Sequence, residues 1–324
     1  MIARRVVALL SAIVLLAASG AVRGKITEFA GPSGGVLRSI AAGPDGNMWF
    51  VEDSRDTVGR ITPAGAVVEF RIPRPPRTSS AQPFGIAAGP DGNLWFTEGA
   101  RGRIGRITPA GAISEFFIPN GDSQPTGITA GPDRALWFTE NFANKVARIT
   151  LDGKTTEFAI PSPRAYPFAI AAARDGNLWF TEYGTGKIGR ITPAGVITEF
   201  ALPSATSRPF GIAAAPDGNL WFTESSADKV GRISPAGAVS EFPVPTRNAG
   251  PLGIAIGSDG TVWFTEGSLT NPVHKIGSIA PSGALTEFTL PTPSAQPFAI
   301  AVGGNGIVWF TENKAHANRI GLLQ

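Results

Sequence analysis

Leu94-Trp95-Phe96-Thr97-Glu98 recurs in near-identical form seven times along the chain. Each copy carries a Trp-Phe pair, and successive pairs lie 46, 42, 42, 42, 42 and 46 residues apart. The pairs are Trp49-Phe50, Trp95-Phe96, Trp137-Phe138, Trp179-Phe180, Trp221-Phe222, Trp263-Phe264 and Trp309-Phe310. A fixed period of this length is the signature of a repeat architecture. The sequence therefore predicts seven copies of one structural unit.

Each repeat contains four short apolar segments separated by turn residues, as the second copy shows. Residues 84–88 and 93–98 are apolar and aromatic, with a Gly-Pro-Asp-Gly turn between them. Residues 104–108 and 112–116 follow, with a Pro-Ala-Gly turn between them. We call these segments strands A, B, C and D, and their spacing is typical of an antiparallel meander. Seven such units around an axis predict an all-β fold, a seven-bladed β-propeller.

The two ends of the chain complement each other. A Glu-Phe pair marks strand D and occurs seven times, but its first copy, Glu28-Phe29, precedes every Trp-Phe pair. The last repeat ends in strand C, at residues 319–323. We therefore predict that residues 25–29 supply the outer strand of the last blade, which closes the ring and leaves no open sheet edge.

Composition favours one globular domain. The 324 residues include 40 Gly and 28 Pro at fixed places in each repeat, so these residues mark the turns of a single domain at residues 25–324. The net charge of +3, without a run of Lys or Arg, argues against nucleic-acid binding. The sequence contains no Cys, so we expect a monomer that depends on packing and not on disulfides.

Residues 1–24 have the pattern of a signal peptide. Arg4-Arg5 form a charged start, and residues 6–18 form an apolar run followed by small residues. A membrane anchor is the alternative, but the apolar run is short for a bilayer span. We therefore expect a secreted or periplasmic protein with no stable membrane insertion after cleavage.

Strand direction places the loops on two faces of the ring. The A–B and C–D turns share one face and are nearly invariant, whereas the B–C and D–A loops share the other face and vary. Variable loops on a rigid scaffold usually carry function, so we expect the functional site on the B–C/D–A face. The two histidines, His274 and His316, lie in the two lengthened B–C loops. The D–A loop after blade 1 is basic, with Arg71, Arg74 and Arg77.

Three segments resemble the repeats of the virginiamycin B lyase (streptogramin lyase) family. They are the Trp-Phe-Thr-Glu segment, Lys-Ile-Gly-Arg-Ile-Thr at 187–192 and Ile-Thr-Glu-Phe at 197–200. The resemblance covers essentially all of residues 25–324 and implies a single-chain, seven-bladed propeller. It also implies a lyase that opens a cyclic depsipeptide antibiotic by elimination across its ester bond, with Mg²⁺ and a histidine general base.

The catalytic positions of the family do not carry over to this chain. The resemblance places the site histidines at the start of strand A in the last two blades, where this chain has Leu252 and Phe298. Neither side chain can accept a proton or bind a metal ion. Family carboxylates match Gln296 and Asn313, with Glu312 beside the latter. The resemblance therefore implies the scaffold of the family without its usual chemistry.

The residues that open strand A form a ring around the predicted axis, and four of the seven are Phe. They are Arg38, Phe84, Thr126, Phe168, Phe210, Leu252 and Phe298. One interpretation is an aromatic funnel that binds an apolar small molecule or a peptide. The alternative is that these side chains only fill the mouth of the channel.

The glutamates that end strand B form a second set on the same face. They are Glu52, Glu98, Glu140, Glu182, Glu224, Glu266 and Glu312. Converging carboxylates can bind a divalent cation that prefers oxygen, which makes Glu266 and Glu312 candidate metal ligands. Mg²⁺ is the expected ion if the chemistry of the family is retained. The alternative is that these glutamates form pairs or backbone caps between blades.

The histidines are candidate general bases of an altered lyase site. His274 or His316 beside Glu312 would form a base near neutral pH, provided that the two imidazoles lie close together and face the axis. The alternative is a pair of solvent-exposed loop histidines. Three functions follow, in order of preference: a ligand-binding propeller, a Mg²⁺-dependent lyase, and a scaffold whose basic D–A loop docks an acidic protein.

Overall fold

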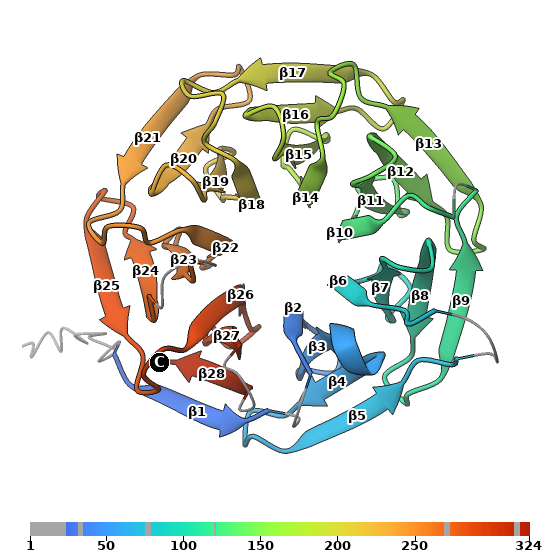
Figure 1. The fold of residues 1–324 in the computed structure, drawn as a ribbon, viewed down its shortest axis with the longest axis horizontal. Coiled ribbons are helices and arrows are strands. Elements are labelled where there is room, and N and C mark those ends of the chain that lie inside the picture. Colours follow the sequence, from blue (N-terminus) through green and yellow to red (C-terminus); the bar gives the residue numbers. More distant parts are fainter. Residues whose placement is uncertain (1–23, 32–34, 75–78, 120, 269–272, 314–317) are drawn as a thin grey trace, which may run out of the picture.

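A computed structural model describes residues 24–324 except 32–34, 75–78, 120, 269–272 and 314–317. Within these residues, 28 strands form seven four-stranded antiparallel sheets, which are arranged as blades around a central axis (Figure 1). The helical structure in the described part is a single 3-10 turn, η1 (Asp53–Arg55). The predicted all-β, seven-bladed propeller is confirmed.

The first three blades run from strand A at the axis to strand D at the rim (Figure 1). Blade 1 contains β2 (Leu37–Ala42), β3 (Met48–Glu52), β4 (Thr57–Ile61) and β5 (Val67–Arg71). Blade 2 contains β6 (Pro83–Ala88), β7 (Leu94–Glu98), β8 (Arg103–Ile107) and β9 (Ile113–Phe117). Blade 3 contains β10 (Pro125–Ala130), β11 (Leu136–Glu140), β12 (Lys145–Ile149) and β13 (Thr155–Ala159).

The next three blades repeat this order. Blade 4 contains β14 (Pro167–Ala172), β15 (Leu178–Glu182), β16 (Lys187–Ile191) and β17 (Ile197–Ala201). Blade 5 contains β18 (Pro209–Ala214), β19 (Leu220–Glu224), β20 (Lys229–Ile233) and β21 (Val239–Pro243). Blade 6 contains β22 (Pro251–Ile256), β23 (Val262–Glu266), β24 (Lys275–Ile279) and β25 (Leu285–Thr289).

Blade 7 joins the two ends of the chain. It contains β26 (Gln296–Val302), β27 (Val308–Asn313), β28 (Arg319–Leu323) and, as its outer strand, β1 (Ile26–Ala30). β1 pairs antiparallel with β28, with Glu28 opposite Gly321 and Phe29 opposite Ile320. The predicted closure of the ring by the N-terminal strand is confirmed.

The repeated Trp and Phe fill the space between neighbouring blades. Trp95 of blade 2 is fully buried and packs in one cluster with Leu136 and Phe138 of blade 3. It also stacks on Phe116 of its own strand D, with ring centroids 5.2 Å apart. Full burial of a large apolar side chain stabilises a fold by about 2–3 kcal/mol. Because every blade uses the same pair in the same way, this segment is the structural core of the ring.

In blades 2 to 7 a threonine of strand B ties the blade to the next strand A, whereas blade 1 has Val51 at this position. Thr97 Oγ1 donates a hydrogen bond to the carbonyl of Thr126 at 2.9 Å and accepts one from the Gly85 amide at 2.8 Å. Thr223 Oγ1 donates in the same way to the carbonyl of Leu252 at 2.7 Å. These bonds fix the backbone of the residues that open strand A, and thereby position the ring of side chains at the axis.

The predicted signal peptide falls almost entirely on residues 1–23, which lie outside the described residues. Export therefore stays a prediction. Within the described residues, no helix has the length and apolar character needed to cross a membrane.

Candidate functional site

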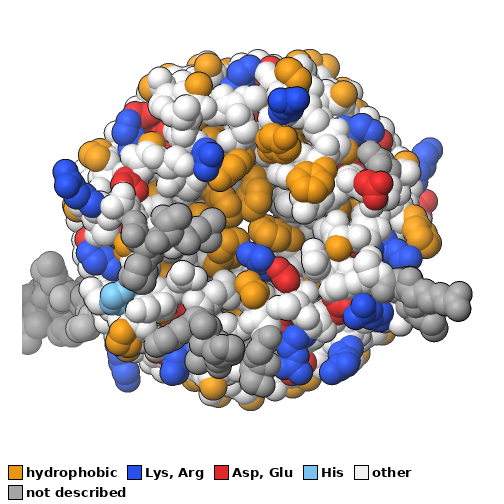
Figure 2. All heavy atoms as spheres, viewed as in Figure 1, with side chains coloured by type: hydrophobic (Ala, Val, Ile, Leu, Met, Phe, Trp, Pro, Cys, Tyr) orange, Lys and Arg blue, Asp and Glu red, His pale blue; other side chains and the backbone are white. Residues whose placement is uncertain are grey.

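Four of the seven side chains that open the axial strands are phenylalanines that contact one another. Their ring centroids are 5.2 Å apart for Phe84 and Phe168, and 4.1 Å apart for Phe168 and Phe210. The circle closes through Phe298, at 5.7 Å from Phe210 and 6.0 Å from Phe84. Figure 2 shows apolar side chains gathered in a hollow at the middle of the ring. We name this circle of four rings the phenyl floor.

The phenyl floor is partly open to solvent. Phe84, Phe168 and Phe210 are half-buried, whereas Phe298 is nearly buried. Three of the four contacts are edge-to-face, an arrangement that aromatic pairs favour. The rings therefore support one another and still present apolar surface at the centre of a concave face, where ligand sites commonly occur.

Arg38 adds a charge beside the phenyl floor. Its guanidinium carbon lies 5.4 Å from the ring centroids of both Phe84 and Phe298, within the range of a cation–π contact. Its Nε and Nη2 donate hydrogen bonds to one carboxylate oxygen of Asp53, at 2.8 and 2.7 Å. The ion pair is partly exposed, so it offers a polar contact at the edge of an apolar surface.

Thr126 and Leu252 of the predicted ring are buried. Thr126 is buried, and its Oγ1 lies 2.9 Å from Thr139 Oγ1 and donates to the Phe168 carbonyl at 3.0 Å. Leu252 is 2% exposed. The ring therefore divides into four partly exposed side chains, those of Arg38, Phe84, Phe168 and Phe210, and three buried ones, those of Thr126, Leu252 and Phe298.

A groove of about 170 Å³ opens beside the phenyl floor over blades 1 to 3. The side chains that line it include Arg38, Asp53, Gln82, Phe84, Gln124, Asn141 and Phe168. Three of these side chains are amides, which can both donate and accept hydrogen bonds. Gln82, Gln124 and Asn141 were not among the residues predicted from the sequence. The signal that could have found them is their position in the loops at which the repeats differ.

Further aromatic side chains lie beside the phenyl floor at blades 4 and 5. The Tyr183 ring centroid lies 6.3 Å from that of Phe168 and 6.4 Å from that of Phe210. Arg208 lies over Tyr183 at 5.4 Å, and its Nη1 donates to the phenol oxygen at 3.4 Å. Tyr166 packs against Gly184, so closely that a Cβ on residue 184 would lie 2.5 Å from the Tyr166 ring. The funnel thus has an amide-rich side and an aromatic side.

The seven glutamates of strand B are buried, and burial raises their pKa values. The pKa rises to about 7 for Glu52, Glu140, Glu182 and Glu224, and to about 8 for Glu98, Glu266 and Glu312. Repulsion by a strand D glutamate of the same blade adds to this effect, as with Glu287 beside Glu266 and Glu28 beside Glu312. Glu98, Glu266 and Glu312 are therefore mostly protonated at neutral pH, and the other four carboxyls titrate there.

The candidate metal ligands, Glu266 and Glu312, each face the outer strand of their own blade. Lys275 bonds Glu287 at 2.8 Å in blade 6, and Arg319 lies 3.7 Å from Glu28 in blade 7, so a basic side chain accompanies both carboxyl pairs. Across the described part of the chain, no group of three or more His, Cys, Asp or Glu has the spacing of a metal site.

Strand D glutamates make hydrogen bonds between blades. Glu287 of blade 6 accepts from the backbone amide of Thr246 at 3.1 Å and from its hydroxyl at 2.9 Å. Glu28 accepts from the Thr292 amide at 3.0 Å, which links blade 7 to the loop that follows blade 6. The glutamates repeated in strand D therefore contribute to the assembly of the ring.

Of the two candidate histidines, the structure describes His274. His274 immediately precedes β24, and its carbonyl accepts a hydrogen bond from the Leu290 amide at 2.9 Å, beyond the end of β25. It therefore belongs to the outer half of blade 6, two strands from the axial strand β22. His316 and Arg77 lie outside the described residues. The pairing of His274 with His316 beside Glu312, and docking by the basic loop, stay predictions.

The positions that the resemblance assigns to catalysis carry other side chains with other tasks. Phe298 belongs to the phenyl floor and Leu252 is packed within blade 6. Asn313 Oδ1 accepts from the Leu37 amide, and its Nδ2 donates to the Leu37 carbonyl, both at 2.8 Å. A residue that bonds both groups of Leu37 needs an amide, because a carboxylate cannot donate. These residues do not fit a Mg²⁺ site with a histidine base.

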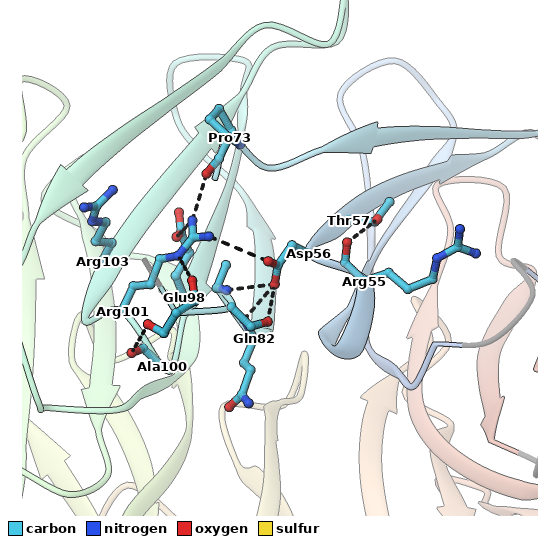
Figure 3. A network of polar contacts seen from close by, with 12 residues as sticks. Arg55, Asp56, Thr57, Pro73, Gln82, Glu98, Ala100, Arg101 and Arg103 are labelled. Atoms are coloured by element: carbon cyan, nitrogen blue, oxygen red, sulfur yellow. Dashed lines mark hydrogen bonds and ion pairs between the residues drawn. The ribbon is translucent and has the colours of Figure 1, made fainter. Parts of the chain in front are cut away.

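Arg101 organises the loops above blades 1 and 2 (Figure 3). Its side chain is 3% exposed and lies 3.6 Å from Asp56, 3.4 Å from Glu98 and 3.4 Å from Glu115. Its Nη1 also donates to the Pro73 carbonyl at 2.9 Å. Because three carboxyl groups and a backbone carbonyl surround one guanidinium, the network joins the two blades and holds the loop between them.

Asp56 connects the Arg101 network to the backbone at the edge of the groove. Its Oδ1 accepts hydrogen bonds from the backbone amides of Ala81 at 2.7 Å and Gln82 at 3.3 Å. The side chain of Gln82 points away from the ionic network (Figure 3). The backbone of Gln82 is thus anchored while its amide group reaches the groove.

Comparison with known proteins gives one family. The sequence model of the virginiamycin B lyase family matches residues 17–267 and, in an overlapping match, residues 80–324. A streptogramin B lyase structure is 33% identical, with a TM-score of 0.86 over 94% of this chain and 98% of that chain. A search of curated protein sequences gives no match.

Two structures of virginiamycin B lyase from Staphylococcus aureus are also similar. One is 37% identical, with a TM-score of 0.84 over 93% of this chain and 99% of that chain. The other is a catalytically inactive histidine-to-alanine variant solved with quinupristin, which is 36% identical with the same TM-score and coverage.

Proposed function

We propose that this chain, which belongs to the virginiamycin B lyase family, is a ligand-binding propeller whose site is the funnel on the B–C/D–A face. The observation that carries the proposal is the phenyl floor, whose rings pack against one another while three of the four remain partly exposed. An apolar concave surface with a few convergent polar groups is the usual form of a small-molecule site.

The ligand that this funnel fits has an apolar body and a polar edge. Phe84, Phe168 and Phe210 offer apolar surface. At the margin of this surface, Arg38 provides a positive charge and Asp53 a negative one. A small molecule or a peptide of this character would bury its apolar part on the floor. Quinupristin, with which a relative has been solved, is the natural first probe. We propose that the protein meets its ligand outside the cytoplasm, as the pattern of residues 1–24 indicates.

The lyase reaction has less support in the described residues. Leu252 and Phe298 stand where the family has its histidines, and Asn313 is occupied with the Leu37 backbone. General-base catalysis needs a proton acceptor within hydrogen-bond reach of the substrate, and these side chains provide none. We therefore expect binding without turnover.

Calorimetry with quinupristin tests the proposal. We expect the wild-type protein to bind, and Phe168→Ala and Phe210→Ala to weaken binding by about tenfold or more, since each removes a ring of the floor. Phe117→Ala is the matched control, because Phe117 is 73% exposed on an outer strand and should leave the affinity unchanged. Equal affinity in all variants would reject the funnel as the site.

A chromatographic assay with quinupristin and Mg²⁺ tests the alternative. We expect the ligand to stay intact over hours of incubation. Ring opening that is lost in His274→Ala or His316→Ala would show that the chain is a lyase with displaced histidines.

A further inference from the structure

On the B–C/D–A face, two loop positions have positive φ in five blades each, and these two columns use different amino acids; Arg164, Asn248 and Ser294 have positive φ at other positions of the D–A loops. The first column, just before strand C, has φ of 51–61° and consists of Asp56, Gly102, Asn144, Gly186 and Asp228. The second, just before the proline that opens strand A, has φ of 46–52° and consists of Gln82, Gln124, Tyr166, Arg208 and Gly250. Gly, Asn and Asp tolerate positive φ, whereas other side chains are strained there. Four of the five residues in the second column are therefore strained, whereas the first column has only residues that tolerate this conformation.

The backbone, and not the side chain, requires this conformation. The carbonyl of Gln82 accepts from the Gly99 amide at 3.1 Å, and the carbonyl of Gln124 accepts from the Asn141 amide at 3.1 Å. Both bonds tie the start of strand A to the end of strand B. The proline that follows restricts the backbone further. Gly250 adopts the same φ in blade 6, so glycine is sufficient for the backbone at this place.

Two of the four other side chains in this column line the groove, and a third lies over Tyr183, whose ring contacts the phenyl floor. Gln82 and Gln124 line the groove beside the phenyl floor. Arg208 covers Tyr183, and Tyr166 is 40% exposed. None of the four is part of a buried cluster, so packing does not account for the strain. Strained backbone of this kind is typically retained at functional sites.

We propose that Gln82, Gln124, Tyr166 and Arg208, which we name the rim column, determine the specificity of the funnel by contacting the edge of the bound ligand. The inference rests on the proposed function and extends it to the class of ligand. Amide, phenol and guanidinium groups can all donate hydrogen bonds, and Arg208 adds a positive charge. The rim column therefore selects a ligand that carries carbonyl or carboxylate oxygens around an apolar body.

Glycine substitution separates this role from a structural one. In the purified protein, Gln82→Gly combined with Gln124→Gly, and separately Arg208→Gly, should leave the midpoint of thermal unfolding unchanged or raise it, because strain is relieved. The same variants should weaken quinupristin binding by about tenfold, measured by calorimetry. Unaltered affinity in these variants would overturn the inference, whether or not the midpoint of unfolding is lowered.

Asn144→Gly is the matched control from the first column. Its φ is 57°, but its Oδ1 accepts from the Ala165 amide at 2.7 Å and its Nδ2 donates to the Ser162 carbonyl at 3.0 Å. We expect this variant to lower the unfolding midpoint and to keep the affinity for quinupristin. If the wild-type protein does not bind quinupristin, the proposed function fails and the inference falls with it. If the wild type binds and the rim-column variants bind equally well, the inference alone fails.

Discussion

The two faces of the ring use the same repeat in opposite ways. On the A–B turn face, Asp45, Asp91 and Asp133 each accept a hydrogen bond from the indole nitrogen of the tryptophan four residues later, at 3.0–3.1 Å. The turns there keep nearly the same sequence and place glycine where φ is positive, except in the A–B turn of blade 3, where Arg134 has a φ of 61°. On the B–C/D–A face, the loops differ from blade to blade, and strained Gln, Tyr and Arg residues replace glycine.

The difference indicates which parts of a repeat protein carry information about function. A residue present in every copy, such as Trp95, serves the assembly of the ring, because each blade needs the same interface. A residue that differs between copies, such as Gln124 or Arg208, is free of that requirement. Substitutions should therefore separate the two groups by their effects on stability and on binding.

The largest expected effect comes from the repeated interior. Trp137→Ala removes a fully buried indole between blades 3 and 4 and should lower the free energy of unfolding by about 3–5 kcal/mol. Phe142→Ala, in the B–C loop of the same blade, removes a ring that is 66% exposed and should change stability by less than about 0.5 kcal/mol. Denaturant unfolding measures both, and similar losses would contradict the division of the blade into scaffold and loop.

A smaller loss is expected from an ionic network that occurs in blade 2. Arg101→Met leaves Asp56, Glu98 and Glu115 without their shared, buried cation and should destabilise the protein by about 3 kcal/mol. The control is Lys145→Met, which removes a partly exposed pair with Glu157 and should cost less than about 1 kcal/mol. Equal effects, measured by denaturant unfolding, would show that the network is no more than a surface ion pair.

The pH dependence of stability tests the carboxyls that all seven blades share. In the unfolded chain these glutamates lose their protons near pH 4.5, whereas the folded pKa of Glu140 is raised to about 7 and that of Glu266 to about 8. Between these values the folded state binds more protons, so the free energy of unfolding should fall as pH rises from 5 to 8, by about 2 kcal/mol or more in total. Denaturant unfolding at each pH measures this slope.

The variant Glu140→Gln shows whether the slope comes from these groups. A neutral amide of the same shape should raise stability at pH 8 relative to pH 5 and so flatten the curve. A slope of the opposite sign in the wild type, or an unaltered slope in the variant, would contradict a folded state that holds these protons.

The smallest expected effect compares two asparagines at opposite faces of blade 7. Asn313→Asp removes the donor to the buried Leu37 carbonyl and should lower stability by about 1–2 kcal/mol. Asn305→Asp, on the turn face, keeps the acceptor for the Ile307 amide and restores the residue of the other copies, so stability should be unchanged. Thermal unfolding at neutral pH distinguishes the two, and a larger loss for Asn305→Asp would contradict the assignment.

The fold was predictable from the sequence because its determinants are local and repeated. The spacing of the Trp-Phe pairs predicted seven blades, and the displaced Glu28-Phe29 pair predicted closure by β1. Both inferences need only the period of the chain and the rule that sheet edges are covered.

The site was predictable only in outline. The ring positions were predicted, but how far each side chain is exposed depends on its neighbours, and Thr126 is buried, with hydrogen bonds to Thr139 and the Phe168 carbonyl. The amides Gln82 and Gln124 were missed because backbone strain at these positions leaves no mark on the period. The task of Asn313 was also hidden, since its partner, Leu37, is 276 residues away in the chain.

A crystal structure of the protein with quinupristin tests the central claim most directly. We predict that the compound lies on the phenyl floor, with contacts to Phe168 and Phe210 and polar atoms within hydrogen-bond distance of Gln124 or Arg208. Quinupristin bound on the turn face, or a crystal in which the funnel stays empty while the compound occupies another site, would contradict the account.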